Sequence, residues 1–479
     1  MSGTRRPGLC ESARRSQGGP VLAFIALLAA PPYSPDVAAR LVGGALTDGV
    51  TYARVAELSD GIGPRLSGSP AAEAAVKWAL QRFRDDGLDV HAEPVKVPHW
   101  VRGEERAEVL PARGRAGHPL AVTALGGSPA TPAGGATADV VEVRSIAELQ
   151  ALGEKARGKL VFFNHSMSTA GGKTGYGEAS PLRNRGPAEA AKLGAAGALV
   201  RSLATASLRD PHTGATTFED GAPKVPAAAV AVEDAELLHR LLERGPVRVR
   251  LGLGCRTLPD ADSANVVADV RGREKPDEVV LLGAHLDSWD LGQGAVDDAA
   301  GVAVVMEAAR LIAQLPQRPR RTVRAVLFMN EENGLAGGKA YAQAHAAEAE
   351  RHVAALESDA GAGRPLSVGL RAGEGAQALL APWLQPLETL GAADFGGEAG
   401  GADIGPLAAF RVPFVGVQQD VSRYFDYHHS AADTLDKVRP GDLAQTAAAV
   451  AWVAYALAEM PQALPRPAAP AGRPAGGRP

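Results

Sequence analysis

Hydrophobic and polar positions follow two different periods along this chain, and the change of period divides it into segments. From residue 51 to 97 the pattern is mostly helical. Between residues 72 and 83 the apolar positions recur every three or four residues, which predicts a helix with one buried face. From about residue 102 to 255, short β-type runs alternate with short helical patterns. We expect this block to form a separate α/β domain.

After residue 255 the alternation continues with longer elements. Nearly continuous apolar strands are each followed by an amphipathic helix, and this pattern predicts a mainly parallel sheet with helices on both faces. Ligands of such sheets bind at the carboxyl ends of the strands. The strands are expected at 279–284, 323–329, 353–357 and 413–417, and the helices at 299–315, 336–349, 375–387 and 442–460.

Both ends of the chain differ in composition from its middle. Two arginines precede a ten-residue apolar run that ends at residue 30, which is typical of an export signal, and a cleavage site at residues 37–39 would remove the leader. The last 19 residues contain six prolines and predict a disordered tail. The predicted organisation is a leader at 1–39, a larger domain at 40–101 and 256–460, an inserted domain at 102–255, and a tail at 461–479.

Composition narrows the possible functions. The chain has 50 Lys and Arg against 54 Asp and Glu, and this balance lacks the excess of positive charge expected of a nucleic-acid-binding protein. No apolar run reaches the roughly 20 residues that a membrane-spanning helix needs. Cys10 and Cys255 are too few for a disulfide framework or a cysteine-based zinc module. We therefore expect no nucleic-acid partner and no membrane span.

The first polar cluster follows the strand predicted at 279–284. His285 would emerge at the carboxyl edge of the sheet, and Asp287 would project to the same side if the chain stays extended. The carboxylate of Asp287 could then accept the ring N–H of a metal-bound His285. Asp297 and Asp298 directly precede the next predicted helix, and capping of that helix is the favoured role for Asp298.

Three more clusters follow the later strands. Glu331 and Glu332 are adjacent, so one side chain could bind a metal while the other faces the space above it. A lone pair of this kind is usually a solvated turn, but like charges at the rim of a core favour a nearby cation. Asp359 follows the third strand, and His428 and His429 follow the fourth. A set of histidines and carboxylates without cysteine suits zinc. The set contains more ligands than one tetrahedral zinc uses, and a carboxylate that bridges two ions would account for the excess.

The order of these clusters resembles that of a known family. His-x-Asp, Gly-x-x-Asp-Asp, Glu-Glu, Ser-Asp and His-Ser follow one another as in the co-catalytic zinc aminopeptidase and glutamate carboxypeptidase family. The likeness covers most of the chain and includes stretches outside the motifs, among them residues 63–69 and 211–214. It implies an exopeptidase domain interrupted by a protease-associated insert, which partly roofs the active site in such proteins.

The resemblance also implies a role for each cluster. Two Zn²⁺ ions per chain would be held by side chains that are all present, so nothing indicates an inactive relative. The implied roles are Asp297 as the bridge between the ions, His285 and Asp359 on one ion, Glu332 and His429 on the other, Glu331 as general base, and Asp287 as the carboxylate behind His285.

The predicted activity is hydrolysis of dipeptides or short peptides with a free amino terminus, by a metal-bridging hydroxide and Glu331 as general base. His428 is a candidate oxyanion donor, because some relatives carry a tyrosine just before the metal histidine. Asp403 is a candidate for orienting the substrate or for capping a loop. A polar, glycine-rich loop at residues 166–185 is expected to reach the cleft from the insert and to limit substrate length.

Three alternatives remain open at this point. A carboxypeptidase for acidic C-terminal residues would need arginines near the site, and Arg423 is the one beside a motif. A two-metal phosphodiesterase and a non-catalytic binding protein on the same fold are the others. The sequence also leaves open whether the protein forms a homodimer.

Overall fold

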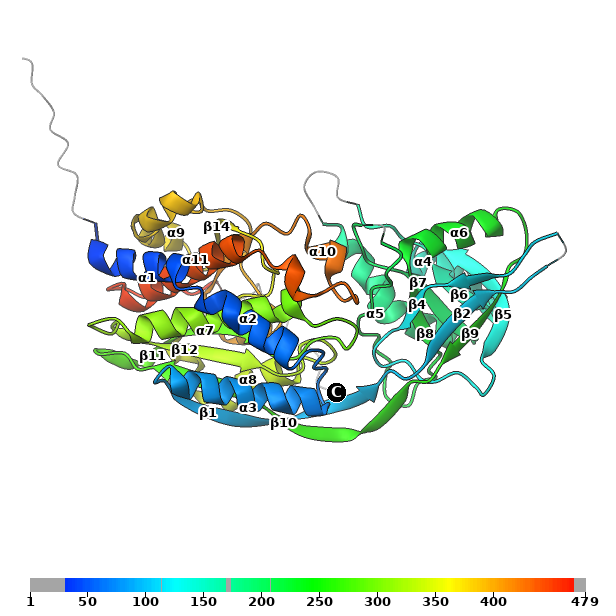
Figure 1. The fold of residues 1–479 in the computed structure, drawn as a ribbon, viewed down its shortest axis with the longest axis horizontal. Coiled ribbons are helices and arrows are strands. Elements are labelled where there is room, and N and C mark those ends of the chain that lie inside the picture. Colours follow the sequence, from blue (N-terminus) through cyan, green and yellow to red (C-terminus); the bar gives the residue numbers. More distant parts are fainter. Residues whose placement is uncertain (1–30, 113, 169–173, 207, 469–479) are drawn as a thin grey trace, which may run out of the picture.

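The computed structural model describes residues 31–112, 114–168, 174–206 and 208–468. Its larger domain is built on a seven-stranded sheet in the order β1-β10-β12-β11-β13-β15-β14 (Figure 1). The four central strands run parallel, whereas β1, β10 and β14 pair antiparallel at the edges. The strands are β1 (Asp89–Val101), β10 (Arg256–Val270), β11 (Lys275–His285), β12 (Arg321–Phe328), β13 (His352–Glu357), β14 (Pro365–Arg371) and β15 (Phe414–Gln419).

The expectation of a mainly parallel sheet is therefore correct for the centre and wrong for the edges. The prediction of mostly helical structure up to residue 97 also fails for β1, whose first residues carry no helical apolar stripe. β1 gains its order from a long antiparallel pairing with β10, which is distant in sequence. Pairing of this kind is not visible in a local pattern.

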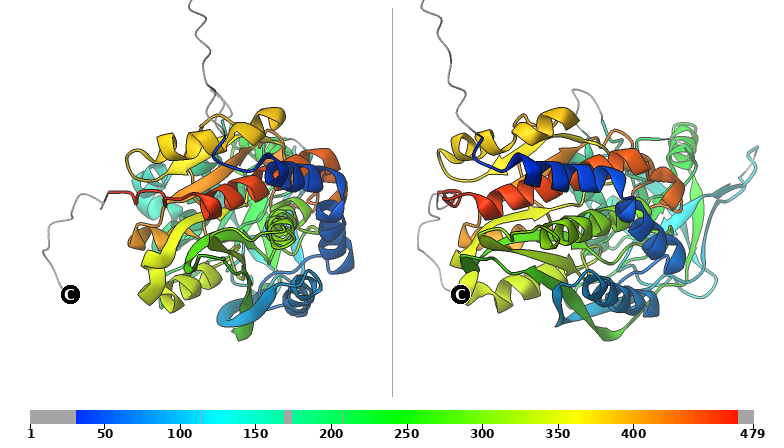
Figure 2. Two further views of the ribbon diagram at one scale, coloured as in Figure 1. Left: turned by 90° about the vertical axis from the view of Figure 1, so that its left-hand side faces the viewer. Right: turned by 60° about the vertical axis from the view of Figure 1, so that its left-hand side comes forward.

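Helices cover both faces of this sheet (Figures 1 and 2). On one face α7 and α11 lie between the sheet and the outer helix α1, and both are therefore buried almost all round. The other face is covered by α8 and a 3₁₀ turn at Gly405–Phe410. The helices are α1 (Pro35–Thr47), α2 (Val50–Gly61), α3 (Pro70–Asp85), α7 (Ala300–Ala313), α8 (Ala336–Ala344), α9 (Ala376–Leu380), α10 (Tyr424–Tyr427) and α11 (Pro440–Glu459).

A second, eight-stranded sheet lies within residues 102–255, which we call the insert. The long strands β1 and β10 carry the chain into and out of it and still pair at Val101 and Arg256. Its helices are α4 (Ile146–Leu152), α5 (Tyr176–Lys192) and α6 (Val232–Leu242). Its strands are β2 (Glu105–Val109), β3 (His118–Leu120), β4 (Val122–Ala124), β5 (Ala136–Val143), β6 (Leu160–Phe163), β7 (Gly197–Arg201), β8 (Ala227–Val230) and β9 (Arg248–Leu253).

Helix α5 occupies much of the segment that was expected to be a polar loop. It contains Pro181 and Pro187, which lowers its intrinsic helix propensity. Its buried side includes Leu182 and Gly186, and a Cβ at Gly186 would come within 2.8 Å of the ring of Phe163. Packing against the insert sheet therefore stabilises a helix that the local sequence does not favour.

Both predicted ends of the larger domain need correction. Helix α1 buries Ala38 and Leu41 in the core, so cleavage at residues 37–39 would cut through a packed helix. At the other end Leu464 is buried, and Arg466 donates to four backbone carbonyls, so residues 461–468 belong to the domain. The rest of the predicted leader and tail, residues 1–30 and 469–479, lies outside the described residues.

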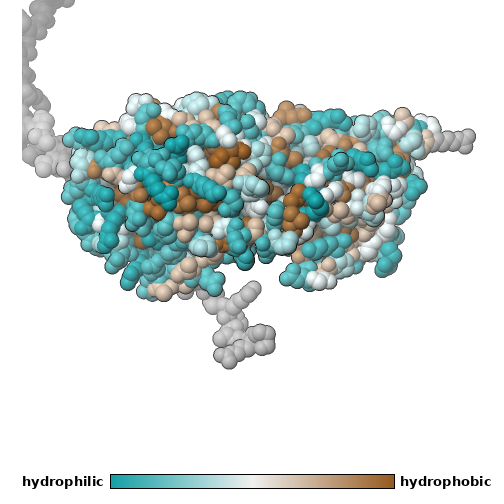
Figure 3. Space-filling view, turned by 60° about the horizontal axis from the view of Figure 1, so that its bottom comes forward, coloured by the Kyte–Doolittle hydropathy of each residue, from teal (hydrophilic) through white to brown (hydrophobic). Residues whose placement is uncertain are grey.

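The surface is mainly hydrophilic. Figure 3 shows one face, on which hydrophobic residues form small, separate patches between polar ones. Within the described ranges, the large hydrophobic side chains that are exposed are Leu46, Leu208 and Leu366. None of the helices described is both long enough and apolar enough to cross a membrane.

Candidate active site

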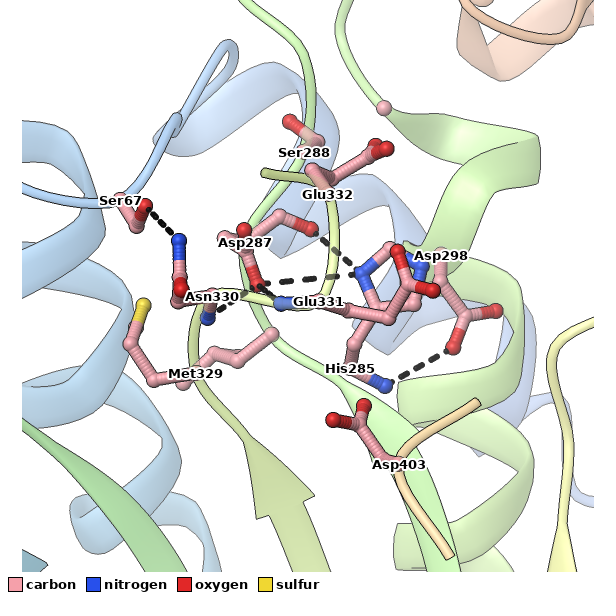
Figure 4. Close-up of polar contacts among 12 residues, drawn as sticks. Ser67, His285, Asp287, Ser288, Asp298, Met329, Asn330, Glu331, Glu332 and Asp403 are labelled. Atoms are coloured by element: carbon pink, nitrogen blue, oxygen red, sulfur yellow. Dashed lines mark hydrogen bonds and ion pairs between the residues drawn. The ribbon is translucent and has the colours of Figure 1, made fainter. Parts of the chain in front are cut away.

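Three neighbouring strands bring acidic and histidine side chains to one edge of the larger sheet, and Figure 4 shows those that follow β11 and β12. Strand β11 ends at His285, which lies in register with Phe328 of β12. The turn after β12 carries Glu331 and Glu332, and Asp359 lies two residues beyond the end of β13. The parallel register therefore places the predicted side chains together, as expected for the carboxyl ends of parallel strands.

Asp297 lies at the centre of this group. Its Oδ1 is 3.0 Å from Nε2 of His285, and its Oδ2 is 3.3 Å from Nε2 of His429. Glu332 approaches the second histidine, with Oε2 3.0 Å from Nε2 of His429. On the other side, Oδ1 of Asp359 is 3.7 Å from Nε2 of His285. One carboxylate thus faces a different histidine with each of its oxygens.

Two groups of potential metal ligands share Asp297. In one, the donor atoms of His285, Asp297 and Asp359 all lie within 4.8 Å of one another. The other contains Asp297, His428 and His429 within the same limit. The structure thus brings His428 into a group where the sequence led us to expect Glu332, although Glu332 contacts His429 directly.

The chemistry of these donors fits zinc. They offer imidazole nitrogens and carboxylate oxygens, which zinc accepts, and they are mostly buried. Burial raises the pKa of Glu332 and Asp359, and that of Glu331 well above its usual range. Burial would raise the pKa of Asp297 as well, but hydrogen bonds with His285 and His429 hold this pKa well below its usual range. So many acidic groups in one buried place favour divalent cations.

The contact predicted between His285 and Asp287 differs from the one observed. Nδ1 of His285 lies 2.9 Å from the backbone oxygen of Asp287, but 3.9 Å from its carboxylate. The carboxylate instead accepts the backbone N–H groups of Asn330 and Glu331, at 2.7 and 3.0 Å. Asp287 therefore orients the histidine ring through its main chain and the turn after β12 through its side chain.

Two aspartates shape the loop around Asp297. Asp298 accepts from the backbone N–H of Gly301 in α7, which is the capping role predicted for it, and also from that of His285. Asp433 accepts from three consecutive backbone N–H groups that end at Asp297. Sequence reasoning missed Asp433, since only its position four residues after His429 marks it.

His428 lies against the ring of His429, with centroids 3.5 Å apart. Its Nδ1 is buried and has no hydrogen-bond partner among the described residues. Burial lowers the pKa of His428 well below its usual range, so the ring is neutral, and its other nitrogen, Nε2, lies 3.6 Å from Oδ2 of Asp297.

Asp403 lies deeper than a substrate-orienting residue would. Both of its carboxylate oxygens are buried and, within the described part of the chain, make no hydrogen bond. The cavity wall is formed at this point by Ala402. Figure 4 shows Asp403 beside His285 and Asp298.

A cavity of about 890 Å³ opens above these residues, between the larger domain and the insert. The larger domain contributes Glu331, Asp359 and His428 to its wall. Sequence reasoning assigned no site residue to the insert, yet side chains of the insert also line the cavity. Arg423, the arginine considered for binding an acidic C-terminal residue, is not among the lining residues. The contributors from the insert include Tyr176, Arg183, Thr216, Phe218 and Lys224.

Comparison with known proteins adds independent information. Residues 265–454 match Peptidase family M28. The chain is 40% identical to Carboxypeptidase Q of Mus musculus over 418 residues, which is 87% of each chain. It is also similar to the crystal structure of a Peptidase M28 precursor from Shewanella amazonensis SB2B, with 42% identity, a TM-score of 0.87, and coverage of 91% of this chain and 98% of the other.

A more distant likeness concerns the fold alone. A zinc aminopeptidase from Bacillus subtilis matches with a TM-score of 0.63 at 18% identity, over 86% of this chain and 96% of that one. This likeness supports the mixed α/β fold and carries no further conclusion.

Proposed function

This chain belongs to peptidase family M28 as a carboxypeptidase Q-like metallo-exopeptidase, and we propose that it uses two zinc ions to hydrolyse dipeptides and short peptides with a free amino terminus. The position of Asp297 carries this proposal, because its two oxygens face His285 and His429 at 3.0 and 3.3 Å. Two-metal hydrolases place a pair of ions close together in this way. The proposed ligands are Asp297 for both ions, His285 and Asp359 for one, and Glu332 and His429 for the other.

Glu331 is the proposed general base. Its side chain lines the cavity, and its backbone N–H is held by the carboxylate of Asp287. When bound, zinc polarises the scissile carbonyl and lowers the pKa of water toward 7. A carboxylate oxygen of Glu331 then takes a proton from the attacking water and passes it to the nitrogen of the leaving amine.

His428 is the proposed donor to the oxyanion. Its ring lines the cavity, and Nδ1 has no other partner in the part of the chain described. An N–H that is held in place in a buried site stabilises charge that develops during the reaction. Aromatic rings of Tyr176, Tyr424 and Phe425 surround it at centroid distances of 5.3, 4.9 and 5.2 Å, which limits its movement.

The insert is proposed to be of the protease-associated type and to set substrate length. It forms one wall of a cavity whose volume of about 890 Å³ is typical of small-molecule sites. Such a space admits a short peptide and excludes a folded protein. Helix α5 takes the role first given to a loop, since it carries Tyr176 and Arg183 into the wall.

The test is a peptide digest with purified, zinc-loaded protein, read by mass spectrometry. We expect rapid cleavage of dipeptides, slower cleavage of their ten-residue extensions, and none of an N-acetylated dipeptide. Glu331→Gln is the matched control, because it retains the ligands. Equal kcat/KM for a dipeptide and its extension would reject the length limit. Preference for acidic C-terminal residues or for phosphoesters would support an alternative activity instead.

Export and assembly are proposals of their own. We expect the mature protein to begin before Pro35, because α1 starts at that residue and buries Ala38, Leu41 and Ala45. N-terminal sequencing of the protein from the periplasm or medium tests export, and sedimentation distinguishes a monomer from a homodimer.

A further inference from the structure

Among the described residues, hydrogen bonds join the insert to one half of the proposed metal centre and not to the other. Thr213, in the connection between β7 and β8, makes two hydrogen bonds with His429 of the larger domain. Its backbone N–H donates to the carbonyl of His429 at 2.8 Å, and its carbonyl lies 3.3 Å from Nδ1 of the same residue. The insert thus holds both the main chain and the ring of a proposed ligand.

The ring contact determines which nitrogen of His429 can bind a metal. Nε2 faces the carboxylates of Asp297 and Glu332, so it is the nitrogen on the metal side. Nδ1 must then carry the proton, and it needs an acceptor. The carbonyl of Thr213 supplies one, as a backbone carbonyl commonly does for metal-bound histidines.

Arg183 of α5 holds that carbonyl in place. Its Nη1 donates to the Thr213 carbonyl at 3.2 Å and lies 3.3 Å from Nδ1 of His429. A guanidinium has only donors, so Arg183 and His429 must share this one carbonyl as their acceptor. Nη2 donates to the hydroxyl of Tyr176 at 2.6 Å, and the side chain is 5% exposed, so the guanidinium has a single well-defined position.

A second connection reaches Glu332, the other proposed ligand of the same ion. Its Oε1 accepts from the backbone N–H of Trp289 at 3.2 Å. The ring of Trp289 is buried in the hydrophobic core of the insert, and Gly126 provides the space, because a Cβ there would lie 2.1 Å from the ring. Next to it, Asp290 forms a salt bridge with Arg102 of the insert at 2.6 Å.

The other metal position lacks such support. Within the described residues, no hydrogen bond from the insert reaches His285 or Asp359. His285 is instead oriented by the backbone oxygen of Asp287, in its own domain. The two ions would therefore depend on the insert to different degrees.

From this asymmetry, and resting on the proposed two-zinc function, we infer that Arg183 and Thr213 are positioning residues for His429. They make the insert necessary for tight binding at the position formed by Asp297, Glu332 and His429. The position formed by His285, Asp297 and Asp359 is independent of them. The insert then contributes to the metal centre itself, in addition to limiting the cavity.

The test measures zinc binding by the whole chain, without using activity. Arg183→Met removes the guanidinium, and Arg201→Met is the matched control, since Arg201 is a buried insert arginine that contacts Asn164 and Glu236. Stoichiometry comes from metal analysis, and the two dissociation constants come from chelator competition. For Arg183→Met we expect one ion of unchanged affinity and one bound 10- to 100-fold more weakly, as is typical when a partner of a metal ligand is lost.

Gly214→Ala provides a second variant that retains the arginine. A Cβ at Gly214 would lie 2.3 Å from Cζ of Arg183, so the guanidinium must move, and we expect the same loss at one position. Arg183→Lys should recover part of the affinity. Circular dichroism and thermal unfolding in chelator show whether each metal-free variant is folded.

Each outcome has a distinct meaning. Two ions of unchanged affinity in folded Arg183→Met would overturn the positioning role, and so would equal weakening of both ions. Unaltered protein that binds fewer than two ions, or that is inactive when loaded, would count against the proposed function instead.

Discussion

The strand ends and the loop at residues 428–433 both bring side chains to Asp297, but different forces hold them. His285 ends a buried parallel strand and lies in register with Phe328 of its neighbour. His429 adopts a φ of +61°, a region that residues other than glycine rarely occupy, and its carbonyl accepts from Thr213 of another domain. Ligands at strand ends are thus positioned by the sheet, whereas the loop ligand depends on contacts from outside its own domain.

This difference has an energetic consequence. Displacing His285 would require disrupting β11, whose last seven residues are all buried. Displacing His429 requires only the loss of a few hydrogen bonds across a domain boundary, each contributing about 1 kcal/mol. We therefore expect the loop side of the metal centre to fail first under any perturbation.

Metal removal should have the largest effect, because it abolishes the function of both sides. Chelation is expected to reduce peptidase activity to background, and added zinc should restore it. Stepwise chelation sharpens the comparison, since the first ion lost should be the one bound by Glu332 and His429. In His429→Ala that first step should be missing, as metal analysis can show. Full turnover by thoroughly metal-free protein would contradict the two-zinc proposal.

The two adjacent glutamates should differ in phenotype. Glu331→Gln removes the proposed base but no ligand, so kcat should fall by roughly 100-fold or more while zinc content stays unchanged. Glu332→Gln should instead lower zinc content. Steady-state kinetics and metal analysis on the same preparations separate the two effects. If Glu331→Gln lost zinc and Glu332→Gln kept it, the two roles would have to be exchanged.

Asp433 provides a test of the loop that carries Asp297, the ligand shared by both ions. The carboxylate of Asp433 accepts three backbone N–H groups, whereas the NH₂ of an asparagine can only donate. In Asp433→Asn at least one of these N–H groups would therefore lose its acceptor, and we expect Asp297 to shift. Because Asp297 serves both ions, both affinities should fall, by roughly 10-fold or more in chelator competition. Asp436→Asn is the control, because that side chain is 72% exposed. Unchanged affinities in Asp433→Asn would show that the loop tolerates this loss.

The last prediction concerns stability instead of metal binding or rate, and it involves the start of β13, whose end leads to Asp359. His352 is fully buried, and burial lowers its pKa to about 4 from an ordinary 6.5. The folded state therefore favours the neutral ring, and this contribution is complete above pH 6.5 and is lost as the pH falls toward 4. It amounts to about 3 kcal/mol of unfolding free energy.

The measurement is urea unfolding of the metal-free protein between pH 7 and 4. His352→Gln should flatten the decline in stability, whereas His91→Gln, at an exposed position, should leave it unchanged. An unaltered slope in His352→Gln would show that β13 is not sensitive to this titration.

Local pattern predicted the central strands and most of the side chains near Asp297, because buried parallel strands are continuous apolar runs with polar residues at their ends. It failed where order comes from distant partners. β1 pairs with β10 across the whole insert, and α5 is helical despite two prolines because it packs against the insert sheet. The carboxylate of Asp287 also has different partners from the one predicted, because it accepts backbone N–H groups of the turn after β12 instead of the ring N–H of His285.

By itself, the sequence determined which side chains are available for chemistry and that several of them lie at the ends of central strands. Only the tertiary structure decided how the two sides meet. It placed Asp297 between His285 and His429, Asp433 behind Asp297, and Thr213 against the ring of His429. The physical reason is that periodicity reports burial of a residue in its own element, whereas a hydrogen bond between domains depends on the packing of both.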